Sequence, residues 1–104
     1  MTDAKKRFLM KQTRNMRNLK ELCGHSVIPQ TWEHSTYIDP DGEIHEVLAI
    51  EIETGEFYRT EVKAFIEAFK DYEECFPTME ERPSITINAE RSKRGNAYIT
   101  FSIN

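Results

Sequence analysis

Alternating apolar and polar residues along three stretches of the chain predict β-strands with one buried face. In residues 44–53 the apolar positions that share a face are Ile44, Leu48, Ile50 and Ile52. Residues 31–38, rich in aromatic and β-branched residues, predict a preceding strand, with a Pro/Gly turn at 39–43 between the two. A turn at Thr54-Gly55 leads into residues 56–60 and would put Phe57 on the buried face. We therefore expect a three-stranded meander over residues 31–60.

The C-terminal part of the chain carries the same alternation twice, and residues 84–103 predict a β-hairpin. The turn falls in the sequence RSKRGN at residues 91–96. One face of this hairpin is apolar, and the other is polar but uncharged. The residues expected on the polar face are Ser84, Thr86, Asn88, Tyr98, Thr100 and Ser102.

Two segments predict helices. Residues 61–76 have apolar side chains at steps of three and four, which gives one continuous stripe. Residues 3–22 lack Pro and Gly and favour a helix within a basic segment at residues 1–23, although its apolar stripe is narrow. Residues 25–30 are expected to be a connector, because Pro29 ends regular structure there.

The order of elements places the chain in the α+β class, as one domain over residues 1–104. An N-terminal helix is followed by strands and a helix in the order β-β-β-α-β-β. That order resembles the OB-fold, a small barrel that often binds single strands or oligosaccharides, across residues 31–103, although no family motif supports it. A five-stranded antiparallel sheet with the helix packed on one face fits equally well.

Charge is sorted along the chain, beneath a net charge of −4. Residues 1–20 hold seven basic residues and one acidic residue, and residues 82–104 hold four basic residues and one acidic residue. Residues 21–81 between them hold sixteen acidic and three basic residues. Such segregation is a hint about binding partners.

Several function classes have no support in the sequence. The chain lacks the glycine patterns of phosphate and dinucleotide sites, and no catalytic signature surrounds its thiols or hydroxyls. Cys23 and His25 lie too close for the usual paired metal ligands, and no second pair follows. We therefore expect no enzymatic activity, no cofactor and no metal site. Cys23 and Cys75 are expected to be free thiols of a cytoplasmic protein that does not bind membranes, because no secretory signal or membrane span is visible.

The leading functional hypothesis is a small accessory protein that binds single-stranded nucleic acid. Its size and lack of enzyme motifs suggest a phage or mobile-element origin. An aromatic residue and uncharged polar groups beside a cationic turn suit a single strand, since bases stack and Arg or Lys meets phosphate. The expected binding residues of the hairpin are Arg91, Lys93, Arg94 and Tyr98. The first helix would add Lys5, Lys6, Arg7, Arg14 and Arg17.

The alternative hypothesis is a protein-interaction module. It could self-associate through its oppositely charged regions, or it could act as an inhibitor whose acidic surface mimics DNA. The acidic residues in question are Glu46, Glu51, Glu53, Glu56, Glu61, Glu67, Asp71, Glu73 and Glu74. The two hypotheses depend on geometry: a first helix lying beside the final hairpin would join the basic segments into one surface.

Overall fold

The computed structural model describes residues 3–12 and 15–104, and within them the chain is a mixed α+β fold with seven strands in two sheets and two helices. The helices are α1 (Asp3–Lys11) and α2 (Lys63–Cys75). The four-stranded sheet has the order β1-β5-β4-β3, and the three-stranded sheet has the order β2-β6-β7. The strands are β1 (Arg17–Asn18), β2 (Ser26–Val27), β3 (Pro29–Ile38), β4 (Ile44–Ile52), β5 (Phe57–Thr60), β6 (Ile85–Arg91) and β7 (Ala97–Ile103).

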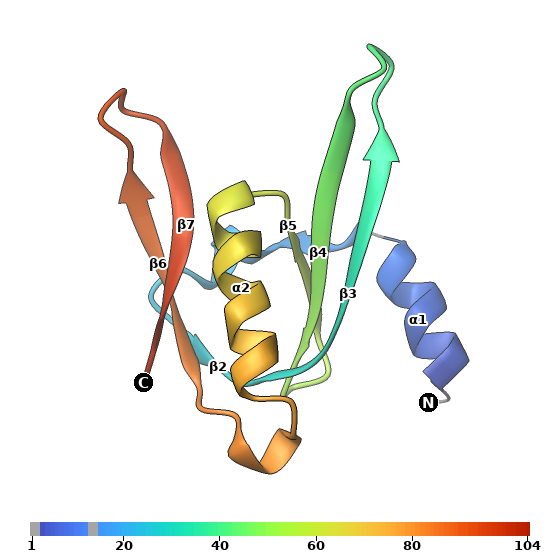
Figure 1. The fold of residues 1–104 in the computed structure, drawn as a ribbon, viewed down its shortest axis with the longest axis vertical. Coiled ribbons are helices and arrows are strands. Elements are labelled where there is room, and N and C mark those ends of the chain that lie inside the picture. The colour runs from blue at the N-terminus through green and yellow to red at the C-terminus, as the bar shows by residue number, and fades with distance from the viewer. Residues whose placement is uncertain (1–2, 13–14) are drawn as a thin grey trace.

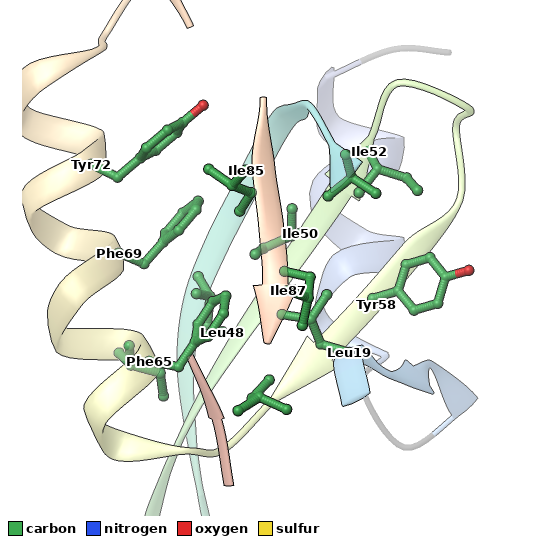
Figure 2. Packing of buried hydrophobic residues seen from close by; sticks show 13 residues of the cluster. Leu19, Leu48, Ile50, Ile52, Tyr58, Phe65, Phe69, Tyr72, Ile85 and Ile87 are labelled. Atoms are coloured by element: carbon green, nitrogen blue, oxygen red, sulfur yellow. The ribbon is translucent and has the colours of Figure 1, made fainter. Parts of the chain in front are cut away.

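Helix α2 stands between the β3–β4 hairpin and the β6–β7 hairpin, and the core forms around it (Figure 1). Its apolar stripe is buried as the spacing predicts, through Phe65, Ile66, Phe69 and Tyr72. Figure 2 shows these aromatic side chains directed at the aliphatic residues of β4 and β6, among them Leu48 and Ile85. One hydrophobic cluster thus joins both sheets to the helix.

The turn after β4 corrects the prediction for Phe57. The Ile52 N–H donates to the Glu56 carbonyl at 3.0 Å, so the loop has three residues rather than two. Gly55 closes it at a φ of +87°, a backbone conformation that favours glycine. One extra loop residue moves every following side chain to the other face. Phe57 therefore pairs with Glu51 on the face away from α2, and Tyr58 is the buried residue.

The first helix is shorter than the predicted 3–22, since α1 ends at Lys11. Met10 of α1 is buried on the outer face of the four-stranded sheet, the face away from α2, where its sulfur lies 3.8 Å from the Thr31 hydroxyl. Leu19 is buried in the cluster on the opposite face. One straight helix cannot bury both residues, so the chain crosses the sheet edge as β1, which pairs in parallel with β5, and continues as the short 3₁₀ turn η2 (Leu19–Leu22).

The predicted connector at residues 25–30 is also wrong. Ser26 and Val27 form β2, which pairs antiparallel with β6, and Pro29 begins β3 rather than ending regular structure. A proline is tolerated at the first residue of an edge strand, because its missing N–H costs no ladder bond there. The chain thus changes sheets within three residues, at a corner between β2 and β3.

The sheet is neither a single five-stranded sheet nor a closed barrel. The predicted order from β3 to β7 is present, but β1 and β2 add a strand to each of two separate sheets. No strand of one sheet pairs with a strand of the other within the described residues. Barrel closure needs such pairing around the whole circumference.

No helix in residues 3–12 and 15–104 is long and apolar enough to cross a membrane. Both cysteines are free, as predicted.

Candidate functional site

The two basic segments of the chain lie apart. Helix α1 packs beside β3 on the side away from α2, whereas the β6–β7 hairpin stands on the other side of α2 (Figure 1). Lys5 and Arg7 are exposed on α1. Arg14 and the side chain of Lys6 lie outside the described residues. These two elements therefore do not form the single continuous basic surface that the nucleic-acid hypothesis expected.

Arg17, the last of the predicted N-terminal binding residues, lies on β1. Its Nη1 donates to Glu56 at 3.2 Å in a solvent-exposed ion pair. An exposed pair of this kind contributes little stability, so its main effect is to neutralise the charge locally.

The predicted binding residues of the hairpin are divided between its faces. Glu90 pairs with Tyr98, and Arg91 pairs with Ala97, so Tyr98 and Arg91 lie on opposite faces of the ladder. Lys93 and Arg94 lie in the exposed turn. The aromatic residue on the polar face therefore has a carboxylate as its cross-strand neighbour instead of a cation. A cationic stacking platform is not assembled there.

The polar face of the three-stranded sheet is the one that the alternation predicts, and its side chains bond one another. The Ser26 and Thr86 hydroxyls are 2.8 Å apart, and Asn104 donates to Ser26 at 3.1 Å. Asn88 Nδ2 donates to the Ser102 hydroxyl at 3.3 Å. The polar side chains of this face are therefore hydrogen-bonded to one another within the sheet.

The free edge of β7 differs from the other sheet edges. Proteins protect edge strands by keeping them short, by adding charge, proline or bulges, or by covering them. Strands β1 and β2 have two residues each. Strand β3 begins with Pro29, has an irregular register between Pro29 and Thr31, carries Glu33, and lies against α1. Strand β7 lies against α2 through Phe101, but its seven residues, AYITFSI, include no charge and no proline and keep a regular register.

The hydrogen bonds of the hairpin show which β7 groups are free to bind. The Ser92 N–H donates to the Asn96 carbonyl at 2.9 Å, and the Asn104 N–H donates to the Ser84 carbonyl at 3.0 Å. Bonded and non-bonded pairs alternate in an antiparallel ladder, so the even-numbered residues of β7 bond to β6. The outward groups therefore belong to the odd-numbered residues, Ala97, Ile99, Phe101 and Ile103.

A polar cluster occupies the outer face of the four-stranded sheet where the β3–β4 hairpin approaches the end of β5. The rings of Tyr37 and His45 stack with centroids 4.9 Å apart. His45 Nε2 lies 2.7 Å from Asp39 Oδ2, and this hydrogen bond raises the pKa of His45 and lowers the pKa of Asp39. The Tyr37 hydroxyl donates to Glu61 at 2.7 Å, which raises the pKa of Tyr37. Arg59 Nη1 donates to the other Glu61 oxygen at 2.8 Å.

These bonds assign the cluster a structural role. The second oxygen of Asp39 accepts the N–H groups of Asp41 and Glu43, which holds the hairpin turn. Every carboxylate oxygen of Asp39 and Glu61 thus accepts a hydrogen bond and none is free to act as a base. A neighbouring open hollow of about 1020 Å³ is lined by hydroxyls of Ser35 and Thr36, and no free carboxylate or imidazole lies beside them among its described lining residues. Arg59 Nε is buried and has no hydrogen-bond partner among the described residues.

One group of residues in the described chain could bring three ligands to a metal ion. Ligand atoms of Asp39, Glu43 and His45 lie within 4.8 Å of one another. His45 and Asp39 already bond each other in this group, and the Asp39 bonds to the turn account for its position. The hydrogen bonds of Asp39 that hold the β3–β4 turn therefore account for the proximity of these three side chains without a metal ion.

The acidic residues do not gather on one surface. Glu46 and Glu51 lie on opposite faces of β4, and Glu51 is buried. Glu53 accepts the Ile28 N–H, and Glu61 is held by Tyr37 and Arg59. The remaining acids are divided between the β4–β5 turn, where Glu56 lies, and helix α2, which carries Glu67, Asp71, Glu73 and Glu74.

The candidate interaction site is therefore the free edge of β7, which the sequence hypothesis did not single out. Seven consecutive residues without charge or proline, in a chain that is 31% charged, were the available signal. Comparisons of the chain with protein-family models, with curated protein sequences and with solved structures found no match in any of the three.

Proposed function

We propose that this chain is a non-enzymatic protein-interaction module that binds an extended polypeptide by adding it as a strand to the free edge of β7. One observation carries the proposal: although α2 lies against β7, this strand is the one long sheet edge in the described residues with no charge, no proline and a regular register. In strand addition, main-chain hydrogen bonds supply affinity, and alternate side chains supply specificity. The outward groups of four β7 residues offer such a ladder.

A synthetic peptide with the sequence of residues 96–104, extended by two lysines for solubility, is the probe. Titrated into dilute ¹⁵N-labelled protein, it is expected to move the amide resonances of Ala97, Ile99, Phe101 and Ile103 more than those of their even-numbered neighbours. The reason is that only the odd-numbered amides gain a hydrogen bond. Heteronuclear correlation spectra provide the measurement.

The matched control is the same peptide with proline at the positions of Ile99 and Phe101. Proline removes two main-chain donors and leaves the length and most side chains unchanged. This peptide should cause no shifts. Equal shifts with both peptides, or no shifts with either at millimolar concentration, would count against strand addition at β7.

A second candidate function rests on the exposed cations of the β6–β7 turn. Arg91, Lys93 and Arg94 are exposed, and no ion pair involves them among the described residues. Three cations can neutralise about three phosphates. Binding to a single strand should then show a slope of log affinity against log salt of about −2, because each phosphate contributes about −0.7.

Fluorescence anisotropy with a labelled oligothymidine measures this slope. Lys93→Gln with Arg94→Gln should weaken binding and flatten the slope. The matched pair Lys5→Gln with Arg7→Gln should leave both unchanged, because α1 lies on the other side of α2. If the α1 pair weakens binding as much as the turn pair, the two segments act together, contrary to this hypothesis. No binding at low salt would remove the candidate altogether.

A further inference from the structure

We propose that the strand added to β7 is β7 of a second copy of this chain, paired antiparallel about a two-fold axis at Thr100. This inference rests on the proposed function and names its partner. It joins two three-stranded sheets into a continuous six-stranded sheet.

The register follows from the outward groups. A new antiparallel ladder on this edge must use the odd-numbered residues of both strands. Symmetric pairing about Thr100 places Ile99 opposite Phe101 of the second copy and Ala97 opposite its Ile103. All four of these residues are odd-numbered, so the donors and acceptors of both edges meet. Thr100 then faces its own equivalent in a non-hydrogen-bonded pair.

The side chains of β7 suit this pairing on both faces. On the apolar face, aromatic and β-branched residues would lie opposite each other as Ile99 and Phe101, a favourable cross-strand pair. Ile103, which is 52% exposed in the single chain, would gain an apolar neighbour in Ala97. On the polar face, Tyr98 would lie opposite Ser102. Since β7 carries no charge, the self-pairing brings no like charges together.

The cationic turn favours the antiparallel arrangement over a parallel one. Lys93 and Arg94 lie at one end of β7 only. Antiparallel pairing sends the two turns to opposite ends of the joined sheet, whereas parallel pairing would set them side by side. Like charges within the screening length repel, so the two-fold arrangement avoids that cost.

Thr100→Lys and Thr100→Glu test this axis, since each puts two like charges directly opposite each other. Each variant alone is expected to raise the dimer dissociation constant at least about tenfold. An equimolar mixture should recover a dissociation constant near or below that of the unmodified chain, because Lys and Glu then face each other. Sedimentation equilibrium over a range of concentrations gives the constants. Recovery in the mixture also shows that both variants are folded.

The matched control is Asn88→Lys. Asn88 pairs with Thr100 on the same face but one strand further from the edge. In the joined sheet it would lie about three strand spacings, or roughly 14 Å, from its equivalent, beyond the screening length in physiological salt. Its dissociation constant should stay within about threefold of the unmodified value.

Two outcomes overturn the inference. A chain that stays monomeric at all concentrations has no self-pairing, and a dimer that tolerates both Thr100 variants uses another surface. Either result can occur together with binding of the 96–104 peptide, in which case strand addition at β7 stands but a second intact copy of the chain is not its partner. Absence of peptide binding would instead contradict the proposed function itself.

Discussion

Replacing Phe69 with alanine is expected to lower the free energy of unfolding by about 3–5 kcal/mol. Phe69 is fully buried, and its ring lies 5.2 Å from Trp32, 5.2 Å from Tyr72 and 6.0 Å from Phe101, measured between centroids. These partners come from β3, α2 and β7. The truncation therefore leaves a cavity where both sheets meet the helix, and the ring contacts are lost together.

Urea unfolding followed by circular dichroism measures the change. A chain of this size is expected to have about 5–15 kcal/mol of stability, so the variant should retain only a fraction of it. Phe8→Ala is the matched control: Phe8 is 63% exposed on α1, and its truncation should change the stability by less than about 0.5 kcal/mol. Equal effects of the two substitutions would mean that Phe69 does not lie at the centre of the core.

The elements that could be predicted from the sequence are those whose pattern is local. Helix α2 and strand β4 were both predicted at nearly the observed bounds, because each pattern repeats along a continuous segment. The faces of the β6–β7 hairpin were predicted for the same reason. The prediction of one buried face on β4 is wrong, since residues 47–52 are buried on both faces and Ile44 is 71% exposed. In α2 and the hairpin, burial of one face requires only that the periodicity be read correctly.

The elements that could not be predicted depend on distant partners or on a single loop residue. Strands β1 and β2 have two residues each, which is too few for an alternating pattern to be recognised in the sequence. They form strands because they pair with β5 and β6 respectively. Phe57 was assigned to the wrong face because a two-residue and a three-residue loop are equally compatible with the letters Glu-Thr-Gly. Length of the turn alone decides the register there.

The candidate site illustrates the same limit. The composition of residues 97–103 can be read directly, but whether a strand lies at an edge depends on which strands pair with it. Likewise, the basic charge could be counted by segment, whereas the separation of α1 from the final hairpin is a property of the packed chain. Charge counts also treated Arg82 as part of the basic C-terminal segment, although its side chain is committed to the fold.

Arg82→Ala is expected to destabilise the chain by about 2–4 kcal/mol. Arg82 donates from Nε to the Phe76 carbonyl at 3.1 Å and from Nη2 to the Pro77 carbonyl at 3.1 Å, just beyond the end of α2. Its Nη1 reaches the Gln30 carbonyl at 2.5 Å, and its guanidinium lies 4.3 Å from the centre of the Trp32 ring. The side chain therefore ties the end of α2 to β3.

The same contacts resolve an apparent conflict in the sequence of α2. Its last turn carries acidic residues and no basic one, which opposes the helix dipole. Arg82 brings a positive charge to that end from outside the helix. Arg82→Lys should recover less than half of the loss, because an ammonium group cannot reproduce the planar fork that bonds several carbonyls.

Arg94→Ala is the matched control, since Arg94 is exposed in the β6–β7 turn, and it should change the stability by less than about 0.5 kcal/mol. The two arginines also separate structure from binding. If Arg82→Ala leaves the urea midpoint unchanged but weakens binding to an oligothymidine, the side chain serves a ligand and its contacts with the backbone carbonyls contribute nothing. We expect the opposite division, with Arg82 affecting stability and Arg94 affecting only the weak electrostatic binding of the turn.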